Sequence, residues 1–412
     1  MPAGAPDNPL QKYVNRSVRF RFDGIDFRFN LSHALFSSYD IDDGTRLLLK
    51  TIAERLDLST VRSVLDVGCG VGVLGICVGA RAPHASILMQ DRDALAAAFA
   101  AENASLNGRG SVGVEIALGF DGPPNRRFDL IVSNLPAKAG RPVLESFFRK
   151  AAARLRESGT AAFVIVRPLA EFARSTAEQA GLEVTWAEEN ARYTVLHTHR
   201  GALQTAGVPD AGAPPGSTDI APYIRARATW SCAGTTYEAE TAYSLPDFDT
   251  LGHSVENAMT LLSQTGVRGE VMVWNPGQGH VPLFLVRRAG RSLSGISLAA
   301  RDALELAMTE RNLRTFGLPP RSVSPAPSEV FMARGQTPGQ VDLLCASPHA
   351  VPRVPWQGDL LGAAMTILKP HGRLLVSATS TDVQRLLAAR GGFRLVAGRK
   401  HAGHRVVLLE RP

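Results

Sequence analysis

Polar and apolar residues alternate near the start of the chain. Residues 18–29 read VRFRFDGIDFRF, and the alternation runs on both sides of Asp23-Gly24. Alternation with a period of two is typical of a strand that buries one face. An Asp-Gly pair between two such runs is a strong signal for a tight turn. The pattern therefore predicts a β-hairpin centred on Asp23-Gly24.

A different pattern follows at residues 64–75, which read VLDVGCGVGVLG. The apolar part is typical of a buried parallel strand, and residues 73–80 are typical of the start of a helix. Between them, glycines stand at the alternate positions 68, 70 and 72. Glycine permits a tight turn and leaves no side chain where a ligand lies against the backbone, and the helix N-terminus adds oriented N–H groups. Such a unit can receive either a dinucleotide or S-adenosylmethionine.

The next 130 or so residues continue this alternation of strands and helices. Further strands are expected at 85–90, 112–117, 128–134, 161–166, 182–187 and 192–199. Helices are expected at 44–56, 94–107, 143–157 and 169–180, with Asp42-Asp43 and Asp93 as N-terminal caps of the first two. The order predicts an α/β domain with a seven-stranded sheet and helices on both faces.

Length and composition indicate a second domain. The chain has 412 residues, more than one typical domain contains. Residues 201–220 are rich in Gly, Pro, Ala, Ser and Thr, which is typical of a linker. We therefore predict domains at 1–200 and 222–412 with a linker at 201–221.

The second half repeats landmarks of the first. Gly234 lies 210 residues after Gly24, and residues 302–317 match residues 93–108 at an offset of 209. At the same offset, residues 275–279 lie over residues 66–70. A near-constant offset over several landmarks predicts a tandem duplication of one fold.

The repeat has lost the residues that carry chemistry in the first copy. With this alignment Asp66 becomes Asn275, Gly72 becomes Val281, Asp91 becomes Ala300, and Asn134 corresponds to about Ser347. Together these changes predict a degenerate C-terminal domain that binds no cofactor. His280 and His349 are expected to be structural.

The composition adds few constraints. Apolar runs end well before 18 residues, the first 11 residues lack a signal-peptide pattern, and the four cysteines form no CxxC pair. We expect no membrane contact, no metal site and a cytoplasmic location. The formal net charge of +7 is compatible with RNA without being diagnostic of it.

The glycine spacing favours S-adenosylmethionine over a dinucleotide. The spacing is G-x-G-x-G, not G-x-G-x-x-G, and Asp66 precedes the first glycine by two residues. A carboxylate would repel a pyrophosphate and attract the cationic amino end of S-adenosylmethionine. The stretch resembles motif I of the class I S-adenosylmethionine-dependent methyltransferases. Asp91 stands where this fold places a ribose-binding acid. The expected cofactor-binding residues are Asp66, Gly68, Cys69, Gly70, Gly72, Asp91, Arg92, Phe120 and Asn134.

A second motif, Asn134-Leu135-Pro136, ends the predicted strand at 128–134. It resembles the motif of amino-group methyltransferases, in which a side-chain oxygen and a backbone carbonyl hold the substrate amine. The resemblance implies that Asn134, Leu135 and Pro136 are catalytic and that catalysis is mainly positioning. Those enzymes carry an aromatic residue where this chain has Ala137, which leaves the stacking of an aromatic base open.

The segment 35–49 resembles the stretch that lies over the cofactor cleft in the methyltransferase small-domain family. It implies substrate-side roles for Phe36 and Thr45, to which we add Lys138. The tandem layout is similar to that of the ribosomal-RNA guanine-N2 methyltransferases, whose inactive copy helps to grip RNA. There the inactive copy comes first, whereas here it comes second.

The sequence thus predicts two tandem Rossmann-like seven-stranded methyltransferase domains, the second degenerate. The leading hypothesis is methyl transfer to an exocyclic amine of an RNA base, with contact between the two domains. Two alternatives remain open: a methyltransferase of a protein glutamine amide or a small-molecule amine, and a non-catalytic RNA-binding or scaffold protein. The sequence leaves the oligomeric state undetermined.

Overall fold

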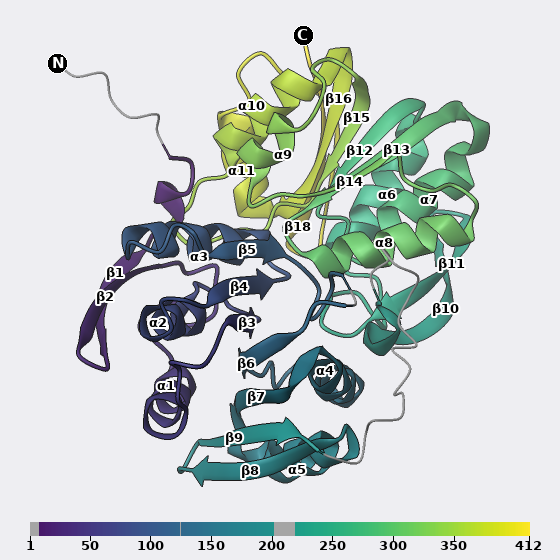
Figure 1. The fold of residues 1–412 in the computed structure, drawn as a ribbon. Coiled ribbons are helices and arrows are strands. Elements are labelled where there is room, and N and C mark those ends of the chain that lie inside the picture. Colours follow the sequence, from purple (N-terminus) through teal and green to yellow (C-terminus); the bar gives the residue numbers. More distant parts are fainter. Residues whose placement is uncertain (1–7, 124, 202–218) are drawn as a thin grey trace, which may run out of the picture. The chain divides into compact units, whose positions relative to one another are not determined.

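A computed structural model describes residues 8–123, 125–201 and 219–412. The chain divides into two compact units, residues 1–222 and 223–412, and Figure 1 shows the elements of each. Most of the predicted linker at 201–221 lies outside the described residues. None of the described helices is long and apolar enough to span a membrane.

The first unit begins with the predicted hairpin. Strands β1 (Arg16–Phe22) and β2 (Ile25–Leu31) pair around Asp23-Gly24, where both residues have positive φ. Every second residue of β1 from Val18 onward is buried, as the alternation requires.

A seven-stranded sheet with the order β5-β4-β3-β6-β7-β9-β8 follows, and only β9 runs antiparallel to its neighbours. Its strands are β3 (Ser63–Val67), β4 (Ser86–Asp91), β5 (Gly113–Ile116), β6 (Phe128–Asn134), β7 (Leu155–Val166), β8 (Leu182–Glu189) and β9 (Tyr193–Arg200). The helices are α1 (Asp43–Arg55), α2 (Val73–Arg81), α3 (Ala94–Leu106), α4 (Arg141–Arg154) and α5 (Ala170–Gln179), and they cover both faces of the sheet (Figure 1). The predicted α/β fold with a seven-stranded sheet is confirmed.

Two predicted boundaries are wrong, because the strand expected at 161–166 begins six residues earlier, at Leu155. The helix expected at 143–157 ends at Arg154, because the fully buried Leu155 adopts an extended conformation and pairs with Phe128 as the first residue of β7.

The second unit repeats this plan. Hairpin strands β10 (Ile224–Cys232) and β11 (Thr235–Ala242) precede a seven-stranded sheet with the order β14-β13-β12-β15-β16-β18-β17. Its strands are β12 (Gly269–Trp274), β13 (Leu293–Ala300), β14 (Ser322–Pro325), β15 (Val341–Ala346), β16 (Leu368–Thr379), β17 (Arg394–His401) and β18 (His404–Glu410). The helices are α6 (His253–Thr265), α7 (His280–Ala289), α8 (Ala303–Thr315), α9 (Glu329–Arg334), α10 (Gln357–Ile367) and α11 (Ser380–Ala388).

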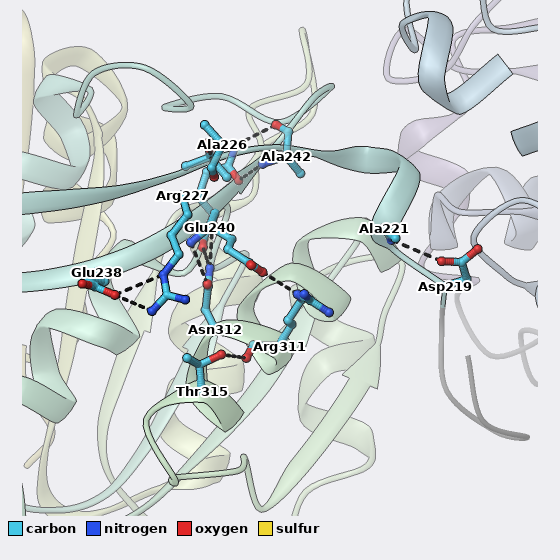
Figure 2. A network of polar contacts seen from close by, with 12 residues as sticks. Asp219, Ala221, Ala226, Arg227, Glu238, Glu240, Ala242, Arg311, Asn312 and Thr315 are labelled. Carbon is cyan, nitrogen blue, oxygen red and sulfur yellow. Dashed lines mark hydrogen bonds and ion pairs between the residues drawn. The ribbon is translucent and has the colours of Figure 1, made fainter. Parts of the chain in front are cut away.

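The duplication extends to a pair of buried asparagines. Asn312 on α8 accepts a hydrogen bond from the Glu240 N–H at 3.0 Å and donates to the Glu240 carbonyl at 2.9 Å, which ties the hairpin to the helix (Figure 2). Asn103 on α3 forms the same two bonds with the Asn30 backbone at 2.8 and 3.1 Å. The match of Asn103 with Asn312 predicted from sequence is confirmed.

The sequence alignment of the glycine turn is wrong by two residues. Asn275 N–H donates to Ala299 as Gly68 N–H donates to Gln90, each at 2.8 Å. Gly279 precedes α7 with φ 89° and ψ 14°, where Gly72 precedes α2 with φ 89° and ψ 15°. Asn275 therefore corresponds to Gly68, Gly279 to Gly72, and Val273 to Asp66.

The two-residue difference arises because the stretch from this turn to the end of the next strand is longer in the second unit. Gly72 precedes Asp91 by 19 residues, whereas Gly279 precedes Ala300 by 21. The third glycine is thus retained in the second unit, and the acid is replaced by an apolar residue.

Candidate active site

The glycine turn lies at the carboxyl end of β3. Gly68, Gly70 and Gly72 have φ values of 71°, 55° and 89°, a region that side chains with a Cβ rarely adopt. A Cβ built at Gly68 or Gly70 would meet nothing within 4 Å, so the turn presents open backbone at these two positions. This arrangement fits a ligand that lies against the main chain.

Two carboxylates, one buried and one half-buried, support the turn. Asp66 is fully buried; one oxygen accepts a hydrogen bond from Gly75 N–H at 2.8 Å, and the other has no partner within the described part of the chain. Asp91 accepts from Gly70 N–H and Asp93 N–H, both at 2.9 Å. The predicted cap at Asp93 is also present, on Leu95 N–H.

Both carboxyl groups have raised pKa values. Burial raises the pKa of Asp66 to about 7, against the lowering effect of Gly75 N–H and with a further contribution from the charge of Asp91. Burial likewise raises the pKa of Asp91, which the N–H groups of Asp93 and Gly70 oppose. Since a nearby cation favours the ionised form of a carboxyl group, the pair suits a cationic ligand.

Three other predicted cofactor residues have different surroundings. Cys69 is buried, and burial raises the pKa of its thiol well above the ordinary value. Arg92 is half-buried beside Asp91. Phe120 is 3% exposed and packs edge-on against Phe147 with ring centroids 4.8 Å apart, so its side chain belongs to the core.

Asn134, at the end of β6, lies in a network that sequence reasoning missed. Its Nδ2 donates to Asp42 Oδ2 at 3.0 Å and to Thr45 Oγ1 at 3.2 Å. Asp42 Oδ2 also accepts from Gly44 N–H and Thr45 N–H, so the predicted cap of α1 is present. Tyr193 on β9 donates its hydroxyl to Asp42 Oδ1 at 3.0 Å.

The Asn134 network and the glycine turn lie at the carboxyl ends of two neighbouring strands, β6 and β3. Strand β3 pairs with β6 in parallel, with Asp66 opposite Val132. Ser133 Oγ donates to the Val67 carbonyl at 2.6 Å, which joins the last residue of β3 to the last but one of β6. In open α/β sheets, ligands bind outside the carboxyl ends of the strands.

The remaining predicted residues differ in exposure. Thr45 and Leu135 are buried, whereas Pro136 and Lys138 are exposed. Phe36 is 70% exposed, unusually open for a large apolar side chain. The contacts among the described residues thus bring Thr45 to Asn134 but connect neither Phe36 nor Lys138 to them.

The equivalent edge of the second unit holds a cavity of about 270 Å³, whose lining includes Val273, Glu305, Ser347 and His404. Although Asp91 is replaced by Ala300, Glu305 on α8 accepts a hydrogen bond from Gly277 N–H at 3.0 Å. This bond reproduces the one between Gly70 and Asp91 with a carboxylate from a different element. Within the described ranges of the chain, no group of three His, Cys, Asp or Glu side chains is arranged to hold a metal ion.

Known proteins match both the first unit and the whole chain. The family model of the methyltransferase small domain matches residues 26–197. The uncharacterized protein YbxB of Bacillus subtilis is 31% identical over 160 residues, which span 39% of this chain and 78% of that protein. Ribosomal RNA small subunit methyltransferase C of Haemophilus influenzae is 39% identical over 108 residues, 26% of this chain and 30% of that protein.

A solved structure shares the tandem architecture. The 16S rRNA N2 G1207 methyltransferase of T. Thermophilus, solved with AdoMet and guanosine, aligns over 97% of this chain and 99% of its own with a TM-score of 0.65 and 17% identity. This similarity confirms the predicted fold of two tandem domains, and the match to YbxB extends over most of that relative. The chain therefore belongs to the methyltransferase small-domain family.

Proposed function

We propose that residues 1–222 transfer a methyl group from S-adenosylmethionine to an exocyclic amine of an RNA base. The observation that carries the proposal is the orientation of Asn134. Its amide nitrogen is engaged by Asp42 and Thr45, and within the described part of the chain no group donates to its Oδ1. That oxygen is therefore available to accept a hydrogen bond from a substrate amine.

The open turn fits the methyl donor. Gly68 and Gly70 would hold it against the backbone, Asp91 would accept hydrogen bonds from its ribose, and the unpartnered oxygen of buried Asp66 matches its cationic amino end. Bound there, S-adenosylmethionine supplies an electrophilic methyl group on a sulfonium.

The protein's own contribution is orientation. Asn134 Oδ1 and the Leu135 carbonyl would accept the two N–H groups of the substrate amine, which turns the nitrogen lone pair toward the donor. Holding the reactants in such a geometry can lower the activation barrier of the transfer by a large amount. The proton released from nitrogen leaves to solvent, and no side chain is required as a base.

Two observations favour RNA as the acceptor. The relative from Haemophilus influenzae and the solved T. Thermophilus enzyme are both named for ribosomal RNA. In addition, residues 1–222 contain 24 Lys and Arg and 24 Asp and Glu, so the net charge of +7 rests entirely on residues 223–412. A basic unit attracts a polyanion through release of counterions. The second unit would thus position RNA for the first.

The alternative acceptor, a glutamine amide or small amine, is favoured by Ala137, where a stacking aromatic would suit a base. Methyl-labelled S-adenosylmethionine and cell extract, digested in parallel with RNase and protease, separate these acceptors. Label released by RNase supports the proposal. Label released by protease moves the assignment to a protein, and label in neither fraction contradicts a macromolecular acceptor.

The role of Asn134 has its own test. We expect Asn134→Ala to abolish transfer while the affinity for S-adenosylhomocysteine, measured by calorimetry, stays nearly unchanged, because the side chain acts on the acceptor. Wild-type activity of this variant would remove Asn134 from the mechanism.

A further inference from the structure

We infer that Asp42 is a positioning residue for this methyl transfer: its carboxylate fixes the orientation of the Asn134 amide, and Tyr193 in turn fixes the carboxylate. The inference rests on the proposed function, because the orientation matters only if Asn134 Oδ1 receives a substrate amine.

The hydrogen bonds determine which way the amide points. An ionised carboxylate accepts hydrogen bonds and donates none, so only the NH2 side of Asn134 can face Asp42 Oδ2 at 3.0 Å. Thr45 Oγ1, at 3.2 Å, takes the same nitrogen as donor. Rotating the amide by 180° would place its oxygen against the carboxylate oxygen, a repulsive contact. Oδ1 is thereby held on the side away from α1.

The second carboxylate oxygen of Asp42 is held by a residue that is distant in the sequence. Tyr193 lies 151 residues further along the chain and donates its hydroxyl to Asp42 Oδ1. Burial raises the pKa of Tyr193, and the hydrogen bond with Asp42 raises it further. The phenol therefore remains protonated at neutral pH and continues to donate.

Gly44 makes room for this arrangement. A Cβ built on it would lie 2.8 Å from Asp42 Oδ2 and 2.9 Å from the Tyr193 ring, closer than real Cβ atoms approach. The glycine therefore permits the carboxylate and the phenol to approach the start of α1 together.

The competing explanation is that Asp42 only caps a helix, and the duplicated unit argues against it. Helix α6 occupies the same place in the second unit and has the same length, 13 residues, yet its N-cap is Gly252 with no side-chain hydrogen bond. The Asp247 carboxylate accepts from the Gly252 N–H instead, so a helix in this position of the fold forms without an acid at its N-cap.

All four members of the network change together in that unit. Asp42, Thr45, Asn134 and Tyr193 correspond to Gly252, Val255, Ser347 and His404, matched through the helix starts and the strand pairings. The second unit has kept its hairpin, its glycine turn and its asparagine tie. Loss of the entire network, alongside retention of these structural features, indicates that the four residues serve one function other than folding.

The decisive variant is Asp42→Asn. An amide caps a helix about as well as a carboxylate, but it carries both donor and acceptor groups and no longer enforces one orientation of Asn134. We expect kcat for the RNA acceptor to fall about 10- to 100-fold, the magnitude of a misplaced reacting group. The affinity for S-adenosylhomocysteine and the melting temperature stay at wild-type values. Tyr193→Phe is expected to lower kcat less, since it leaves the carboxylate in place.

Asp302→Asn is the matched control, because Asp302 caps α8 of the second unit through Leu304 N–H. It should leave kcat unchanged. Wild-type kcat in Asp42→Asn would overturn the inference, and so would a fall in kcat accompanied by equal losses of melting temperature and donor affinity, because that pattern indicates a structural role.

A second readout separates this inference from the proposed function. The side-chain NH2 signals of Asn134, assigned by their absence in Asn134→Ala, should be shifted and slow to exchange in the wild-type ¹⁵N spectrum and should lose both properties in Asp42→Asn. If wild-type protein methylates no RNA but this difference is present, the proposed function fails and the positioning by Asp42 stands. If the signals are the same in both proteins, the positioning fails regardless of activity.

Discussion

The two units keep the same scaffold and differ at one edge of the sheet. Both have the hairpin, the same strand order and a left-handed glycine before the helix that follows the first strand of the sheet. At the carboxyl edge the first unit has the acids Asp66 and Asp91 and the Asn134 network, where the second has Val273, Ala300 and Ser347. Features shared by both units therefore serve the fold, and features confined to the first are candidates for chemistry.

The largest expected effect concerns Asp91, one of the two acids found only in the first unit. We expect Asp91→Ala to weaken S-adenosylhomocysteine binding by about 10- to 100-fold, because hydrogen bonds to a charged group are worth about 1.5–3 kcal/mol. Titration calorimetry measures this. Glu305→Ala is the matched change in the second unit and should leave donor affinity unchanged. Equal losses in the two variants would contradict the assignment of the donor to the first unit.

The shared asparagines should contribute equally to stability. Asn103→Ala and Asn312→Ala each remove a side chain that bonds three buried or half-buried backbone groups. Each change should destabilise its own unit by about 1–3 kcal/mol through unsatisfied backbone groups. Urea unfolding measures both. A large loss in one variant alone would show that the tie is not an equivalent feature of the two units.

Substitutions at Gly70 and Gly277 separate the effect of backbone strain on stability from the effect of an added side chain on donor binding. Gly70 and Gly277 have φ of 55° and 59°, and a Cβ on either meets nothing within 4 Å. Gly70→Ala and Gly277→Ala should therefore each cost about 1–2 kcal/mol of stability through the left-handed conformation. Only Gly70→Ala should also weaken donor binding, because its methyl group would stand where the donor meets the backbone. Unchanged donor affinity in that variant would contradict the proposed contact.

The last prediction is a pH dependence of stability at Asp66, whose place in the second unit is taken by Val273. The pKa of Asp66 is about 7 in the folded protein and about 3.9 when unfolded, so between these values the folded state holds a proton that the unfolded state releases. The unfolding free energy of the ligand-free protein should therefore decrease as pH rises from about 4 to about 7.

Asp66→Asn removes this contribution and keeps an acceptor for Gly75 N–H. Urea unfolding at pH 5 and pH 8 should show that the variant gains stability relative to wild type at the higher pH. The same difference between variant and wild type at both pH values would contradict the raised pKa.

Local patterns predicted the fold well. The Asp23-Gly24 hairpin, the cap at Asp42 and the strands of the first sheet follow from alternation, turn residues and capping, all of which act over a few positions. The Asn134 network could not be found in this way, because it joins residues 42, 134 and 193 and depends on the packing of α1 against the sheet. Asp42 was correctly predicted as a cap, and nothing in its neighbourhood indicated the second partner.

The alignment error has a specific cause. Glycines that recur at every second position superimpose on one another after a shift of two residues, so residues 275–279 can be matched with either 66–70 or 68–72. Backbone hydrogen bonding selects one of them, because Asn275 N–H donates to the Ala299 carbonyl as Gly68 N–H donates to the Gln90 carbonyl. Glu305 gave no signal at all, since a glutamate in the first turn of a helix is ordinary.

The hydrogen bond that Gly277 N–H donates to Glu305 bears on how an acid beside a glycine turn is interpreted. A left-handed glycine turn points an amide N–H inward whether or not a ligand is present, and leaving it without an acceptor is costly. In the second unit the Glu305 carboxylate on α8 accepts from this N–H, although the positions of Asp66 and Asp91 are occupied there by Val273 and Ala300. An acid bonded to the second glycine is therefore found in a unit that has lost the other acids, and by itself it is no mark of ligand binding.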